Sequence, residues 1–180
     1  MTGKSGRLAH LDNRTYASGL ETEPVAKGDD LDSLDGKFDT ASYLSPYSDI
    51  VALLVFEHQM HLMNLFTRVG WKIRLARHEG KVGTSEFATL VSNASNELAD
   101  YMLSVDERPL GGRVQGNSGF QQWFASQGPQ DSRSRSLRQF DLEHRLMRYP
   151  CSYLIYAPAF DGLPIEVKEG VYSRIWRRPR

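Results

Sequence analysis

The sequence predicts an all-α protein: an irregular helical bundle around one long central helix, preceded by an extended irregular N-terminal arm. The longest apolar segment, residues 48–69, carries helical spacing, and residues 85–105 repeat apolar positions with a clear helical period. A chain of 180 residues fits one domain that buries about 70% of its unfolded surface. We therefore divide it into an acidic arm, residues 1–42, and a helical domain, residues 43–180.

The central helix is expected to begin at Ser48, as N-cap, with Asp49 favouring the dipole in the first turn. Apolar residues cover every face of its first two turns, which is typical of a helix buried on most sides. The apolar run meets Glu57 and His58 after seven residues, too early for a membrane span, so we expect a core helix. Its extension places Trp71 and Leu75 inward and ends near residue 80.

A polar cluster lies in the middle of this helix. Glu57, His61, Asn64 and Arg68 share one stripe, whereas His58 lies among apolar positions and is expected to be the more buried histidine. Two interpretations stay open. Either these are structural histidines, or two imidazoles at i, i+3 hold a transition metal or face a haem iron.

The second helix is expected to follow a cap at Thr84 or Ser85. Its apolar positions fall on one face: Phe87, Leu90, Val91, Ala94, Leu98, Tyr101, Met102 and Val105. Glu97 and Asp100 lie beside that face, and two interpretations stay open: they approach His58 and His61, or they are simply solvated.

Four further elements are expected after a glycine-rich connection that matches no phosphate-binding loop. They are a short helix near residues 118–127, a helix over 137–147, a short buried helix broken near Pro158, and a last helix starting at Pro164. The inward anchors are predicted to be Phe120, Trp123, Phe124, Val167, Val171, Ile175 and Trp176.

A second kind of metal site follows from residues 137–147, where Asp141 and His144 stand at helical spacing. Di-iron bundles take carboxylates and Glu-x-x-His pairs from four helices. Here three expected helices offer six side chains, none as Glu-x-x-His: His58, His61, Glu97, Asp100, Asp141 and His144. With Glu57 they form the candidate set of a helix-bundle metalloprotein.

The composition of the chain limits the classes of partner and cofactor that it is expected to bind. The 22 basic and 22 acidic residues balance, so no overall field attracts nucleic acid or anionic lipid. The single cysteine, Cys151, excludes an intrachain disulfide and a CxxCH haem attachment in this chain, and we interpret it as a packing residue. The first residues contain no apolar segment typical of a signal peptide.

Three stretches also resemble a known group of proteins: YLSPYSDIVALLVFEHQMHLMN, then VDERPLGG with GNSGF, then SRSLRQFDLEHRLMRYPCSYLIYAPAFDGLP. They are similar to the C-terminal region of large bacterial proteins that carry cytochrome c-like, CxxCH-containing segments upstream. The resemblance spans residues 43–176. It implies haem binding and electron transfer in an exported or periplasmic protein, with an upstream cytochrome-like segment or a redox protein as partner.

Three functions remain open from the sequence. The first is an accessory helical domain of a cytochrome c-like redox protein, with His58 or His61 as haem or metal ligand. The second is a non-catalytic structural or interaction domain with a buried histidine cluster. The third is the helix-bundle metalloprotein. No nucleotide loop or catalytic triad spacing is evident.

Overall fold

The computed structural model describes residues 39, 41–42 and 49–177 of the chain. The predicted arm, residues 1–42, lies almost wholly outside this part, as does Ser48. The helices are α1 (Ile50–His78), α2 (Ser85–Met102), α3 (Phe120–Ser126), the 3₁₀ helix η3 (Tyr153–Tyr156), α4 (Pro158–Asp161) and α5 (Ile165–Arg177). The predicted all-α class is confirmed, with the long helix where it was expected.

The start of α1 is fixed by Asp49. This residue, and not the expected Ser48, is the N-cap, and its Oδ1 accepts hydrogen bonds from the amides of Val51 at 2.8 Å and Ala52 at 3.1 Å. Its other oxygen, Oδ2, accepts from the amides of Asn117 and Ser118 and from the Ser118 hydroxyl. One carboxylate thereby ties the connection before α3 to the beginning of the central helix.

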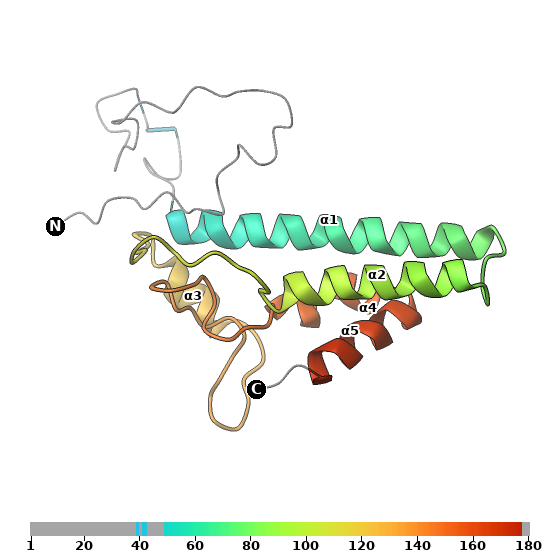
Figure 1. Ribbon diagram of the computed structural model, residues 1–180. Helices are drawn as coiled ribbons and strands as arrows, with labels where there is room; N and C mark the ends of the chain where they lie inside the picture. The colour runs from blue at the N-terminus through green and yellow to red at the C-terminus, as the bar shows by residue number, and fades with distance from the viewer. Residues whose placement is uncertain (1–38, 40, 43–48, 178–180) are drawn as a thin grey trace.

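Helix α1 runs unbroken through Gly70 and ends at His78, followed by Gly80 with a φ of 72°. A left-handed backbone after the last turn is the usual use of glycine at a helix end. The chain then reverses, and α2 returns alongside α1 (Figure 1). Thr84 caps α2, its hydroxyl accepting from the Phe87 amide, as the sequence predicted.

Helix α5 packs mainly on α2 and is closest at Gly170. A Cβ built there would lie 2.3 Å from the Ser95 Oγ, so only glycine allows this approach. Ion pairs anchor both ends of α5: Arg77 of α1 with Glu166, and Asp100 of α2 with Arg174. The core between α1, α2, α4 and α5 contains fully buried Leu62, Ile73, Leu98, Met102, Phe160, Val167 and Val171.

The prediction of a helix over residues 137–147 is wrong. The segment is a turn closed by an isolated bridge between Phe140 and Met147. Asp141 Oδ1 accepts from the amides of Glu143 and His144, and Leu142 has a φ of 59°, which no right-handed helix allows. Leu142 and Met147 nevertheless reach the core.

Several side chains expected inside are exposed. On α1 the outward face carries Leu53, Phe56, Met60, Trp71 and Leu75, at 44% to 68% exposure. Trp123 and Trp176 are also exposed, the latter by 88%. The other elements cover only one side of α1, so its apolar first turns are not buried on most sides.

By length and composition, α1 is apolar enough to cross a membrane, and 33% of its most apolar window is buried in the fold. Core helices satisfy the same criterion, so the expected absence of a span stays a prediction.

Candidate functional site

The histidine cluster predicted on α1 faces the end of α2 and the 3₁₀ helix. The His58 ring stacks on Tyr101 with centroids 5.5 Å apart, and the His61 ring stacks on the same tyrosine at 4.3 Å. Tyr153 lies 5.9 Å from His58. Four rings from three elements therefore meet at one place, which we call the histidine–tyrosine cluster: His58, His61, Tyr101 and Tyr153.

Ser152 is the polar partner of this cluster. His58 Nε2 and the Ser152 Oγ are 2.7 Å apart, with the direction of the bond set by the imidazole tautomer. The same oxygen accepts from the Leu154 amide, and the Ser152 amide donates to the Met102 carbonyl at 2.7 Å. Ser152 joins α1, α2 and the 3₁₀ helix, and 94 residues separate it from His58, so no local spacing could reveal it.

Both histidines are half-buried, so the expectation that His58 is the more buried of the two stays a prediction. Burial, assisted by the positive charge of Arg68, lowers the pKa of His61, while Glu97 acts in the opposite direction. His61 is consequently neutral at pH 7, with one ring nitrogen unprotonated.

Glu57 occupies the same stripe as His61. Burial raises the pKa of its carboxyl group, and its Oε2 atom is buried without a hydrogen-bond partner among the described residues. An unsatisfied buried carboxylate oxygen is uncommon and marks a local cost in stability.

The remaining predicted ligands all have other partners, including Glu97, which lies near enough to act on His61. Glu97 pairs with Arg68, and Asp100 pairs with Arg174. Asp141 accepts from His144, whose ring is exposed at the surface in the 140–147 turn. The part of the chain that the structure describes contains no group of three or more His, Cys, Asp or Glu side chains placed to hold a metal ion.

Two further titratable side chains are Cys151, which precedes Ser152, and Tyr153, which belongs to the cluster. Burial raises the pKa of the Cys151 thiol, which disfavours a nucleophilic thiolate. Burial also raises the pKa of Tyr153 to about 12, although nearby Arg138 acts to lower it. The Arg138 guanidinium lies over the Tyr153 and Phe124 rings, at 5.0 and 4.8 Å. Both groups stay protonated at neutral pH.

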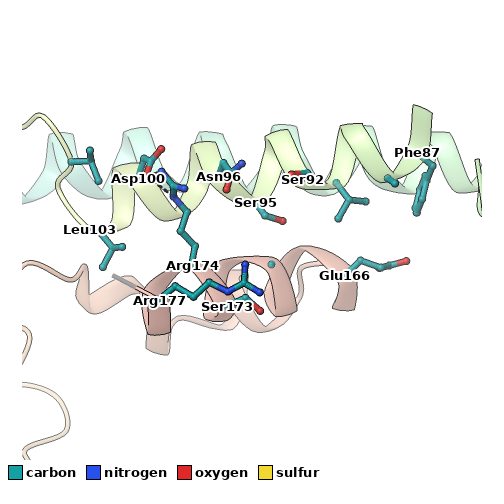
Figure 2. Close-up of a pocket in the computed structure, with 14 residues that line it drawn as sticks. Phe87, Ser92, Ser95, Asn96, Asp100, Leu103, Glu166, Ser173, Arg174 and Arg177 are labelled. Carbon is teal, nitrogen blue, oxygen red and sulfur yellow. Dashed lines mark hydrogen bonds and ion pairs between the residues drawn. The ribbon is translucent and has the colours of Figure 1, made fainter. Parts of the chain in front are cut away.

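Sequence reasoning missed a groove between α2 and α5, with a volume of about 720 Å³. Figure 2 shows Arg174 reaching from α5 to Asp100 on α2, and Ser95 directed toward α5. Apolar side chains of Phe87 and Val91 line its α2 wall. The volume suits a small molecule, but Arg174 is neutralised by Asp100 and Glu166 by Arg77. We therefore describe it as the seam of the helix pair.

Comparisons with protein-family models, with curated proteins and with solved structures found no match.

Proposed function

We propose that this chain is a non-catalytic structural and interaction domain, in which the histidine–tyrosine cluster satisfies internal polarity and α1 binds a protein partner. The observation that carries the proposal is the outward face of α1. Large apolar side chains are exposed there in two groups, at residues 53–60 and 71–75, and apolar patches beyond a few hundred Å² usually mark interaction sites. We call this face the outer ridge: Leu53, Phe56, Met60, Asn64, Thr67, Trp71 and Leu75.

A structural role for the cluster is supported by the partners of its members. His58 Nε2 is occupied by the Ser152 hydroxyl, and both imidazoles lie face to face with Tyr101. A metal ligand offers a ring nitrogen in the plane of the imidazole. The Nε2 atom of His58 is already bonded to Ser152, and stacking on Tyr101 makes both rings part of the α1–α2 contact.

The Ser152–His58 hydrogen bond resembles the nucleophile–base pair of a hydrolase, but its surroundings favour a structural bond. Ser152 is only 3% exposed, and its oxygen also caps the 3₁₀ helix. A catalytic serine must reach a substrate carbonyl carbon, which a capped and buried hydroxyl does not.

A second candidate function is a haem- or metal-binding accessory domain of a cytochrome c-like redox protein. Two features of α1 favour it: His61 is a neutral imidazole, the form that binds metals, and Glu57 on the same stripe has an unpartnered oxygen. In this alternative, His61 and Glu57 hold the ligand, and the partner is an upstream cytochrome-like segment or a redox protein.

One titration separates the two candidates. The purified full chain is titrated with haemin and, separately, with Zn²⁺, Fe²⁺ and Mn²⁺, using absorbance and calorimetry. We expect no stoichiometric binding. A one-to-one complex with a shifted Soret band, lost in His61→Gln and retained in His144→Gln, would refute the structural role and establish the redox alternative. His144 is the matched control because its ring lies at the exposed surface, away from the cluster.

If His58 is structural, removal of its hydrogen-bond partner should lower the stability of the fold, which a second experiment measures. Ser152→Ala removes the hydroxyl that binds His58 and caps the 3₁₀ helix, and it should lower the free energy of unfolding by about 1–2 kcal/mol, because the imidazole nitrogen and the Leu154 amide both lose a hydrogen bond. Ser126→Ala, whose hydroxyl donates to a carbonyl at the surface, is the control and should change stability by less than about 0.5 kcal/mol.

A further inference from the structure

We propose that the partner of the outer ridge is a second copy of this chain, with the two α1 helices packed antiparallel about a two-fold axis at Asn64. This inference rests on the proposed interaction function and identifies its partner. The outer ridge is directly opposite the buried ridge of α1, which includes Val51, Leu62 and Val69. In Figure 1, α1 lies along one edge of the described fold, with α2, α4 and α5 on the same side of it.

The outer ridge is nearly symmetric in sequence. Leu53 and Leu75 both lie eleven residues from Asn64. Phe56 lies eight residues before it and Trp71 seven after it. Met60 lies four before and Thr67 three after. At 3.6 residues per turn, these positions fall within an arc of about 100°. A two-fold axis at Asn64 therefore brings leucine against leucine and phenylalanine against tryptophan.

Charge decides between parallel and antiparallel packing. Residues 50–64 of α1 contain one acid, Glu57, and no lysine or arginine. Residues 65–78 contain Arg68, Lys72, Arg74 and Arg77, and no acid. Arg68 and Arg77 are already paired with Glu97 and Glu166, so parallel helices would bring mainly Lys72 and Arg74 beside their copies. Antiparallel helices place them beside the uncharged and acidic half of the partner, which avoids like-charge contacts.

The exposed area agrees with a weak, specific dimer. An aromatic side chain offers about 150–250 Å² when fully exposed, so the ridge presents roughly 500 Å² per copy and about 1,000 Å² in the pair. That area is near the lower limit of specific interfaces. The chain has no net charge at pH 7, so copies do not repel one another at long range. We expect a monomer–dimer equilibrium in the micromolar range.

Disulfide trapping tests the axis directly. In a Cys151→Ser background, Asn64→Cys places two thiols at the two-fold axis, and mild oxidation should yield mainly covalent dimer. Leu53→Cys alone and Leu75→Cys alone should cross-link poorly, whereas a mixture of these two chains should cross-link well. Asn93→Cys, exposed on α2, is the control. Equal cross-linking of Asn64→Cys and Asn93→Cys would overturn the proposal.

Substitution on the ridge tests the same interface without a thiol. Phe56→Lys adds a cation opposite the cationic half of the partner helix and should weaken the dimer at least about 100-fold in sedimentation. Val82→Lys, at an exposed valine outside the ridge, should leave the equilibrium unchanged. Both chains should keep the helical circular dichroism of the parent, since the replaced side chains are exposed.

The outcomes distinguish this inference from the proposed function. A parent chain that stays monomeric up to several hundred micromolar refutes the second copy, even if haemin and metals do not bind. A monomer whose tryptophan fluorescence shifts to the blue on vesicles of zwitterionic lipid, with the shift lost in Trp71→Phe, assigns the ridge to a membrane surface instead. Stoichiometric haem or metal binding refutes the structural role of the cluster. The dimer is then judged by the disulfide-trapping result alone.

Discussion

Gly170 is the point where α2 and α5 approach most closely, and Gly170→Ala should destabilise the protein. The new Cβ would lie 2.3 Å from the Ser95 Oγ and 2.6 Å from its Cβ. Rotation of Ser95 relieves the first contact but not the second, and it sacrifices the bond from the hydroxyl to the Val167 carbonyl. The helices must therefore separate slightly over buried Val167 and Val171.

The expected magnitude combines three effects. Overpacking typically costs about 1–3 kcal/mol, and the lost neutral hydrogen bond costs about 1 kcal/mol. Alanine recovers about 1 kcal/mol over glycine in helix propensity. The net loss is about 2 kcal/mol, which for a chain of this size lowers Tm by about 4–8 °C.

Urea and thermal unfolding, followed by circular dichroism, measure this change. Gly111→Ala is the control, because a Cβ there meets no atom within 4 Å. In a double-mutant cycle, Ser95→Gly removes the clashing atoms and should recover about 1–2 kcal/mol when combined with Gly170→Ala. If Gly170→Ala raised Tm, as helix propensity alone predicts, the close packing of α2 on α5 would be refuted.

Three further predictions concern ionisable groups on α1 and use urea midpoints across pH. Burial raises the pKa of Glu57 in the folded protein. Its contribution to the free energy of unfolding is therefore favourable at low pH and is lost as pH rises through that raised pKa. Glu57→Gln should therefore stabilise by about 1 kcal/mol at pH 7 and by nothing near pH 4; an equal gain at both pH values contradicts this. Burial lowers the pKa of His61, so acidification from about pH 7 to 5 should destabilise the parent but not His61→Gln; parallel curves refute the assignment. For Asp49, burial would raise the pKa, but the bonds from Ser118, Ala52 and Val51 outweigh it and the net shift is downward. Its stabilisation is present above the ordinary value of 3.8 and disappears as pH falls through the folded value. Asp49→Ala should cost about 3 kcal/mol at pH 7, and a cost below 1 kcal/mol would show that the carboxylate does not hold the 116–118 connection.

Local patterns in the sequence were sufficient to predict the helices whose caps and apolar faces are encoded within a few residues. Helix α2 has one apolar face and a threonine cap, and the structure confirms both, although it ends at Met102 and leaves the expected Val105 beyond it. The end of α1 was signalled by Gly80, and the last helix by the residues after Pro164. Capping and amphipathic period are encoded within a few residues, so a single sequence contains the necessary information.

The segment after α3 could not be predicted in the same way. The spacing of Leu137, Phe140 and Met147 is compatible with a helix, yet Asp141 binds the next amides and competes with helical bonds. The turn is held by partners far along the chain, since the amides of Leu110 and Val114 donate to the carbonyls of residues 144 and 142. Those pairings arise from the tertiary fold.

The candidate site was predicted in part for the same reason. Spacing on one helix identified His58 and His61 as neighbours, and the structure places both beside Tyr101. It could not identify Ser152, or the arginines that pair with Glu97 and Asp100, because these contacts join different elements. Helical spacing reports which residues share a face, but not what that face meets.

The solvent-facing sides of α1 and α2 differ in composition, and this difference supports the proposal that the outer ridge is an interface. Both helices turn one side to solvent, and the exposed positions of α2 hold small or polar residues such as Ser92, Asn93 and Glu97. None of the large exposed apolar side chains belongs to α2, whereas five belong to α1. Scattered single apolar residues on a surface need no explanation, but a ridge aligned along one helix does. The same chain thus contains an ordinary solvated face on α2 and an exposed apolar face on α1, and this contrast is the ground on which we propose an interface there.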